Sequence, residues 1–232
     1  DAVISGAGIP LELPGILGGS GVMAAPIVSS AKGAKTIANF WLKRFGKKPD
    51  FIVAEGSLAG GHLGFDEQDL INGRCQSLKT IVSEIKDLFS DIPLFAGGSV
   101  FDRSDIEAVM EAGADGVQIA TRFIATKECD ASEKFKQTII EAKEEDMVIL
   151  KSPVGMPGRG LLTPLVQKAK AGLRTPPIKC INCIRTCNPA TTVYCINRAL
   201  IEAFKGNLQE GLFFCGGNVG RVKEMTTVKD LI

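Results

Sequence analysis

This sequence has almost no net charge, no long apolar runs and a single histidine. The 27 basic and 26 acidic residues nearly cancel, leaving a net charge of +1. This balance argues against a nucleic-acid or membrane surface that binds through charge. The longest apolar runs are far below the roughly 18 to 20 residues that span a bilayer. We therefore expect no nucleic-acid partner and no membrane partner.

The start of the chain also lacks two features. There is no initiator methionine and no charged leader, since the residues from Asp1 to Ile4 have the pattern of a strand. We expect either a processed chain or a fragment whose beginning is missing. Without a secretory signal, the seven cysteines favour a reduced, cytoplasmic setting over a disulfide framework.

Short apolar runs alternate with amphipathic stretches along most of the chain. Strands are predicted at 2–8, 22–30, 50–56, 92–100 and 115–123, and helices up to about Arg44 and over 78–90, 104–113 and 132–146. In the helix at 104–113, Ser104 and Glu107 stand in capping-box register, and Ile106, Val109 and Met110 form the buried face. This alternation predicts an α/β fold of parallel strands, either a (β/α)₈ barrel or an open doubly wound sheet.

The alternation breaks near residue 148. The stretch 149–164 holds three prolines and three glycines, which predicts a long loop. A short basic helix, a cluster of cysteines and a helix over Tyr194–Lys205 follow. We therefore expect a βα body at 1–148 and a smaller C-terminal region at 149–232.

Glycines gather where the predicted strands end. In parallel α/β folds, ligands bind at that edge of the sheet. The segments 96–99 and 120–123 end successive strands and could form a nest for a phosphate. In a barrel the phosphate site is often built by the last two strands, so these would be strands 7 and 8, and the chain would lack the first three.

The single histidine, His62, follows the strand at 50–56 and belongs on the same ligand face. A lone histidine is more often a surface or core residue, but its position among glycines favours a functional role. No second histidine or carboxylate pair stands at metal-ligand spacing, so an acid–base role is favoured over a metal role.

Four cysteines, Cys180, Cys183, Cys187 and Cys195, have the spacing C-x2-C-x3-C-x7-C. Four thiolates within sixteen residues can wrap a [4Fe–4S] cluster or a zinc ion, or they can be ordinary cysteines of a reduced subdomain. The spacing alone does not choose between these alternatives.

Two stretches carry a family resemblance. "VAEGSLAGGHLG" and "PLFAGGSVFDRSDIEAVMEAGADGVQIATRF" strongly resemble the nitronate monooxygenase family, formerly 2-nitropropane dioxygenases, which also includes FMN-dependent enoyl-acyl-carrier-protein reductases. The resemblance covers about residues 1–160. It implies a TIM barrel of which strands 4 to 8 are present, with FMN as the cofactor.

The same resemblance implies roles for individual residues. His62 would be the catalytic histidine beside the flavin. The residues implied to hold the flavin or its phosphate are Ser5, Gly6, Ala7, Glu55, Gly60, Gly61, Gly97, Gly98, Ser99, Ala120 and Thr121. The C-x2-C-x3-C part of the cysteine cluster is similar to the iron–sulfur motif of larger flavin ene-reductases.

Three functions are open at this point. The first is an FMN-dependent nitronate monooxygenase that oxidises alkyl nitronates with O₂. The second is an NAD(P)H-dependent FMN reductase of activated C=C bonds such as enoyl thioesters. The third is a non-catalytic binding module or inert fragment. Both enzymes imply a small-molecule substrate, and we allow for a homodimer.

Overall fold

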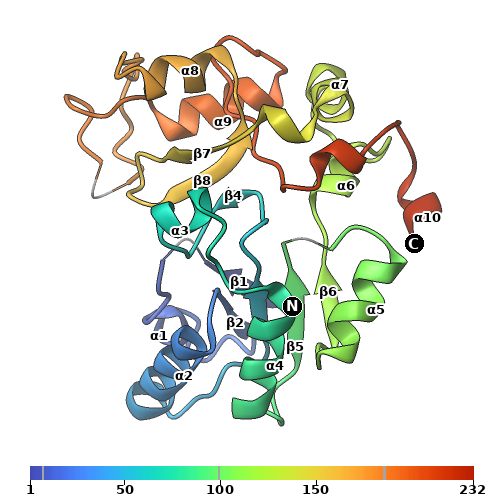
Figure 1. The fold of residues 1–232 in the computed structure, drawn as a ribbon. Helices are drawn as coiled ribbons and strands as arrows, with labels where there is room; N and C mark the ends of the chain where they lie inside the picture. The colour runs from blue at the N-terminus through green and yellow to red at the C-terminus, as the bar shows by residue number, and fades with distance from the viewer. Residues whose placement is uncertain (7, 99, 185–186) are drawn as a thin grey trace. The chain divides into compact units, whose positions relative to one another are not determined.

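The computed structural model describes residues 1–6, 8–98, 100–184 and 187–232 (Figure 1). Contacts divide the chain into two compact units. The first unit comprises residues 1–59 and 63–119, and the second comprises residues 60–62 and 120–232. The division of the main chain falls between Ile119 and Ala120, whereas the sequence led us to expect it near residue 148.

A five-stranded parallel sheet forms the centre of the first unit. Its order is β1-β2-β3-β5-β6, with β1 at Ala2–Ser5, β2 at Met23–Val28, β3 at Ile52–Glu55, β5 at Leu94–Gly97 and β6 at Gly116–Gln118. Each strand pairs with the next sheet strand along the chain. This arrangement of parallel strands joined by helices confirms the predicted α/β fold class.

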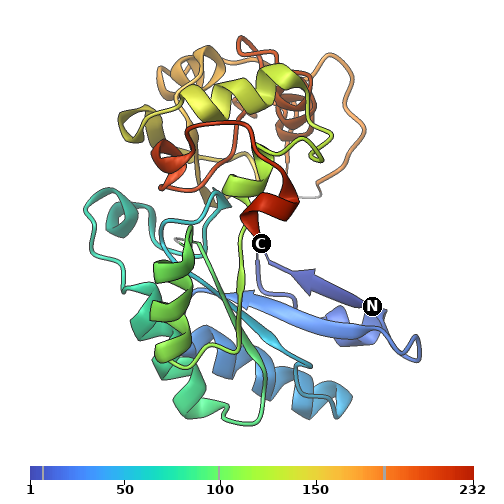
Figure 2. The same cartoon turned by 90° about the vertical axis from the view of Figure 1, so that its right-hand side faces the viewer.

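Helices join these strands and pack against them. They are α1 at Leu13–Ile16, α2 at Ala31–Phe45, α3 at Glu67–Ile71, α4 at Leu78–Leu88 and α5 at Arg103–Glu111. Figure 2 shows α2, α4 and α5 beside the sheet. In agreement with this view, α2 contacts β2, α4 contacts β3 and β5, and α5 contacts β6. The core between helices and sheet contains the fully buried side chains of Trp41, Ile81 and Leu94.

Side-chain caps explain where several of these helices begin. Ser30 and Ser77 accept hydrogen bonds from the first turns of α2 and α4. The cap of α5 differs from our prediction. Asp102 and Asp105 form the capping box, because the helix begins two residues earlier than Ser104 and Glu107 would place it. The predicted burial of Met110 is also wrong, since its side chain is 43% exposed.

A three-stranded antiparallel sheet lies in the second unit, in the order β4-β8-β7. The strands are β4 at Gly61–His62, β7 at Met147–Lys151 and β8 at Pro157–Leu161. The prediction of a long loop over 149–164 is therefore wrong. Its three glycines and the first two of its prolines lie in a hairpin, where Gly155 takes a positive φ of 89° in the turn. His62 lies in a short strand rather than in a loop.

Helices surround this sheet in the second unit. They are α6 at Thr121–Ile124, α7 at Glu133–Glu141, α8 at Pro164–Lys170, α9 at Ile196–Phe204 and α10 at Val228–Leu231, with 3₁₀ turns at Glu144–Asp146 and Val219–Arg221. The predicted helix over 132–146 is thus an α-helix followed by a separate 3₁₀ turn. The core here includes Leu150, Tyr194 and Leu212.

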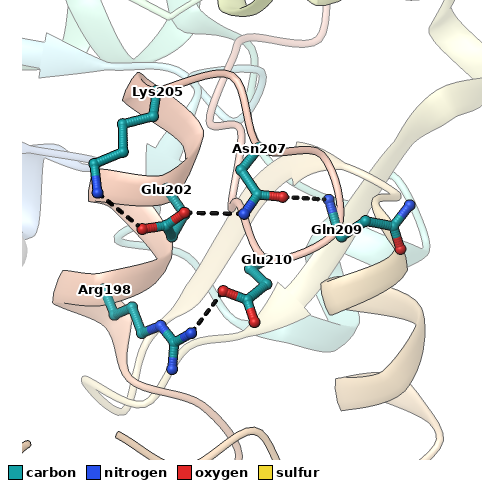
Figure 3. Close-up of polar contacts among 6 residues, drawn as sticks. All are labelled: Arg198, Glu202, Lys205, Asn207, Gln209 and Glu210. Carbon is teal, nitrogen blue, oxygen red and sulfur yellow. Dashed lines mark hydrogen bonds and ion pairs between the residues drawn. The ribbon is translucent and has the colours of Figure 1, made fainter. Parts of the chain in front are cut away.

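A polar network holds the end of α9 to the loop that follows it (Figure 3). Glu202 accepts hydrogen bonds from Lys205 at 3.1 Å and from the Asn207 amide at 2.9 Å. Arg198, one turn earlier, donates to Glu210 at 2.6 Å. The Asn207 and Lys205 contacts hold the pKa of the Glu202 carboxyl below its usual value. The network therefore favours an ionised Glu202 and fixes the chain where Gly206 ends the helix with a φ of 79°.

Candidate active site

The carboxyl ends of the parallel strands meet at one edge of the first unit's sheet. Glu55 at the end of β3 is paired in register with Gly97 at the end of β5, and Gly97 is paired with Gln118 at the end of β6. Ser5 ends β1 at the same edge. The topology thus brings together the strand ends that the resemblance assigned to flavin binding. Ala7 and Ser99 lie outside the described residues.

Local packing and backbone conformation explain why residue 98 is a glycine, and its backbone N–H has no acceptor among the described residues. Its φ is +73°, and a Cβ atom there would lie 2.6 Å from Ala59 Cβ and 2.9 Å from the Gly56 oxygen. Its backbone N–H donates to no other described residue. Gly97 is constrained as well, because a Cβ there would lie 3.3 Å from Gln118. Close packing explains these two glycines, and the free N–H of Gly98 fits a phosphate oxygen.

Glu55 is a carboxyl group in a poorly solvated place. Burial raises its pKa from 4.5 to about 7. Among the described residues its side chain has no hydrogen-bond or ion-pair partner. A carboxyl group of this kind at a ligand-binding edge is a functional candidate, because it can bind a polar group without being saturated by protein contacts.

His62 is held by the antiparallel sheet of the second unit. In β4, His62 pairs with Gly158 of β8. The imidazole Nε2 lies 2.8 Å from Ser152 Oγ, and the ring meets the Phe214 ring edge-on at a centroid distance of 5.2 Å. Burial lowers the pKa of His62. The imidazole is therefore mainly neutral near pH 7, as a general base must be.

The other predicted flavin residues of the second unit have local structural roles. Gly60 packs so closely on the backbone of Cys215 and Gly216 that no Cβ would fit. Gly61 has a φ of +83°. Thr121 Oγ1 accepts a hydrogen bond of 2.8 Å from the Gly216 N–H. Ala120 is the N-cap of α6. Contacts within the unit explain these positions, and their flavin roles stay predictions.

The sequence analysis missed Ser152, which contacts His62, and Tyr194, which lies near Ser152. Ser152 lies in the hairpin that we interpreted as a loop, and Tyr194 lies beside the last of the clustered cysteines. Both side chains are buried. The signal that could have singled out Tyr194 is that it is the only tyrosine in the sequence.

The four clustered cysteines line one cavity of about 270 Å³. Its lining also includes the isoleucines Ile178, Ile181, Ile184, Ile196 and Ile201. Within the part of the chain that the structure describes, no group of three or more His, Cys, Asp or Glu side chains is placed to hold a metal ion. The four cysteines line the same cavity, but their side chains are not placed to coordinate one metal ion. The structure therefore gives no support to the predicted metal site.

The residues present fit FMN in part. The fit rests on the free Gly98 N–H and on the unsaturated Glu55 carboxyl, both at the strand-end edge of the first unit. Among the described residues, we found no helix with the length and apolar character needed to cross a membrane.

Comparison with known proteins gives one family. The family model described as "Nitronate monooxygenase" matches residues 2–232. A "Probable nitronate monooxygenase" from Staphylococcus saprophyticus is 34% identical over 120 residues, which are 51% of this chain and 34% of that protein. Another from Staphylococcus aureus (strain Newman) is 38% identical over 112 residues, which are 48% of this chain and 31% of that protein. The matched stretch thus spans about a third of each relative's length.

Solved structures agree on the fold. FabK from Thermotoga maritima is 26% identical with a TM-score of 0.75, and the match covers 99% of this chain and 65% of that one. Nitroalkane oxidase from Streptomyces ansochromogenes is 21% identical with a TM-score of 0.72, covering 97% and 60%. The second likeness shows the fold alone. With a family model that matches nearly its whole length, the chain belongs to the nitronate monooxygenase family.

Proposed function

We propose that the chain is part of an FMN-dependent nitronate monooxygenase that oxidises alkyl nitronates with O₂. The observation that carries the proposal is the family match over residues 2–232, joined to a histidine that burial keeps neutral. The curated relatives named as probable nitronate monooxygenases support the same activity. Bound FMN would supply the one-electron oxidation of the substrate.

The chain's own residues would bind the cofactor and move a proton. Gly98 would donate its free N–H to the flavin phosphate, and Glu55 would bind a polar group of the flavin or the substrate. His62 would accept a proton from the α-carbon of a neutral nitroalkane, or hold the nitro group of a nitronate. The neutral imidazole can do either, because one nitrogen carries a proton and the other a lone pair.

Replacing His62 tests the proposal. His62→Ala should retain FMN, seen by its absorbance, yet lower turnover of propionate 3-nitronate or of its neutral nitroalkane by roughly 10²-fold or more. Asn39→Ala, at an exposed position of α2, is the matched control and should change neither quantity. Unchanged turnover in His62→Ala would refute the catalytic role, and absence of FMN from the wild-type protein would refute the enzyme.

A second candidate is an NAD(P)H-dependent FMN reductase of activated C=C bonds, such as enoyl thioesters. The likeness to FabK, at 26% identity over nearly the whole chain, supports it. His62 would then bind or protonate the carbonyl region of the substrate. Rapid anaerobic bleaching of the flavin by NADH or NADPH, with no turnover of nitronate, would select this candidate.

An iron–sulfur cluster or zinc ion is not part of this proposal. The described cysteines line a cavity without forming a group able to hold a metal. A small-molecule substrate is proposed with either enzyme, while a homodimer and a cytoplasmic location stay predictions.

A further inference from the structure

Phe214 lies beside His62 along one edge of strand β8. His62 is paired with Gly158, and Phe214 forms an isolated antiparallel bridge with Gly160. Because β7 occupies the other edge of β8, both residues lie on the edge that β4 occupies. Gly158 and Gly160 are two residues apart and so belong to one face of the sheet, and directly paired residues share that face. The side chains of His62 and Phe214 therefore emerge next to each other on the same face.

The two rings are in contact where they emerge. Their centroids are 5.2 Å apart and their planes meet at 72°. An edge-to-face contact of this kind is favourable and directional, because the positive edge of one ring faces the π-electrons of the other. The imidazole has a second contact from a different element, since its Nε2 lies 2.8 Å from the hydroxyl of Ser152 in the β7–β8 turn. Rotation of the imidazole would break one contact or both.

Glycines in β8 leave the space that the Phe214 ring fills. A Cβ atom at Gly158 would lie 3.2 Å from Phe214 Cε1, and one at Gly160 would lie 3.3 Å from Phe214 Cδ1, both closer than ordinary van der Waals contact. At Gly160 the oxygen of Phe213, 2.6 Å from the same position, is a further reason for glycine. Glycine inside a strand ordinarily weakens it and often marks the close approach of another group. Here the phenyl ring is that group, and the two glycines define where it lies.

The backbone that carries Phe214 is also held in place. The oxygen of the preceding residue, Phe213, accepts a hydrogen bond of 2.9 Å from the Leu161 N–H. The Phe213 side chain is fully buried and stacks on Phe135 with a centroid distance of 4.9 Å. Phe214 itself is half-buried and packs against the core of the second unit. The ring beside His62 is thus supported by the strand below it and by its own backbone.

We propose that Phe214 is a positioning residue that, with the Ser152 contact, holds the His62 imidazole in one orientation. The inference rests on the proposed function, in which His62 takes a proton from the substrate or holds its nitro group. A general base needs a fixed orientation, because its nitrogen must stay within hydrogen-bond reach of the proton that it takes. Without the phenyl ring, the imidazole is free to turn about its Cα–Cβ and Cβ–Cγ bonds into the space that the ring leaves.

Phe214→Leu tests the inference, because leucine fills part of the space but has no aromatic ring. The chain has a single histidine, so the histidine signals of ¹³C,¹⁵N-histidine-labelled protein come from His62 alone. We expect three-bond couplings to the His62 Cγ that correspond to one rotamer in the wild type and to an average of rotamers in Phe214→Leu. Turnover of a neutral nitroalkane should fall roughly twofold to tenfold, the range that corresponds to an aromatic pair. Phe214→Tyr, which keeps the ring, should retain the wild-type couplings and turnover.

Phe213→Leu is the matched control, since it removes the ring of the adjacent residue, which stacks on Phe135 and not on His62. It should lower thermal stability and leave the His62 couplings and the turnover unchanged. Gly158→Ala is a second route to the same effect, because its new Cβ would press on the Phe214 ring. It should give averaged couplings with Phe214 still present. Combined with Phe214→Leu it should add little, because both changes act through the same ring.

A single His62 rotamer in Phe214→Leu would overturn the inference, and so would an equal loss of rotamer preference in Phe213→Leu. Fully additive effects of Gly158→Ala and Phe214→Leu on the couplings would also contradict it. The couplings need neither flavin nor turnover, whereas turnover of His62→Ala reports on the proposed function. Failure of the inference and failure of the proposed function are therefore distinguishable.

Discussion

Replacing Glu55 with glutamine should change how the stability of the chain depends on pH. Glu55 ends β3 with a carboxyl group that lacks a partner among the described residues, and burial raises its pKa from 4.5 to about 7. The folded state therefore favours the protonated carboxyl. Below about pH 4.5 the carboxyl is protonated in both states and folding carries no penalty. As the pH rises toward 7, only the unfolded state ionises freely, so stability falls.

The size of this loss of stability follows from the shift in the pKa of Glu55. A change from 4.5 to about 7 corresponds to roughly 3 kcal/mol at about 1.4 kcal/mol for each pKa unit. The side chain is only partly buried, and solvent screening reduces the expected value to about 2 kcal/mol. Glutamine keeps the shape of glutamate and has no charge to desolvate. Glu55→Gln should therefore be more stable than the wild type by about 2 kcal/mol at pH 8 and nearly equal to it at pH 4.5.

Urea unfolding of both proteins at several pH values between 4.5 and 8 measures this difference. Glu111→Gln, an exposed glutamate at the end of α5, is the control and should follow the wild-type curve. The reasoning is refuted if Glu55→Gln and the wild type lose stability in parallel across this pH range. An increase of their difference as the pH falls would refute it as well, since it would show that the folded state favours the ionised form.

Further outcomes follow from local packing and from thiol exposure. Gly98→Ala should destabilise the fold by roughly 2 to 4 kcal/mol, from a left-handed backbone and a clash with Ala59. Gly46→Ala, with φ +65° and open space around it, should lose only the backbone part, about 1 to 2 kcal/mol, and equal losses in urea unfolding would contradict this account. Under native conditions Cys180 should react quickly with a thiol reagent, while Cys215, buried with its pKa raised to about 12, should react only on unfolding. Slow labelling of Cys180 together with bound iron or zinc would show instead that the cysteine cluster holds a metal.

Local patterns in the sequence predicted the five parallel strands well, because buried parallel strands are continuous apolar runs with helices between them. They predicted the cap of α5 less well. Asp102 and Ser104 both suit an N-cap, and the backbone alone decides that Asp102 takes the role. The order of elements puts His62 after β3, but local pattern did not show that it lies in a short strand paired with β8.

The hairpin of β7 and β8 could not be predicted from local pattern. Its strands hold prolines and glycines that ordinarily mark loops, and they become strands by pairing with each other and with Gly61 and His62. The pairing of β8 with Gly61 and His62 joins segments that are far apart in the sequence. For that reason Ser152, which reaches His62 only through this tertiary structure, was not among the predicted site residues.

The pKa shifts of Glu55 and His62 have the same physical cause. Burial raises the pKa of Glu55 and lowers the pKa of His62, so each group is pushed toward its uncharged form near pH 7. A nitronate is an anion, and a fully ionised carboxylate near it would repel it, whereas a neutral carboxyl can donate a hydrogen bond to it. A neutral histidine in turn can act as a base, which an imidazolium cannot. Under the proposed function, the uncharged form of each residue taken by itself suits a nitronate or its neutral nitroalkane. Raising the pH well above 7 should weaken nitronate binding in the wild type, and Glu55→Gln, which stays neutral, should lose this pH dependence in KM.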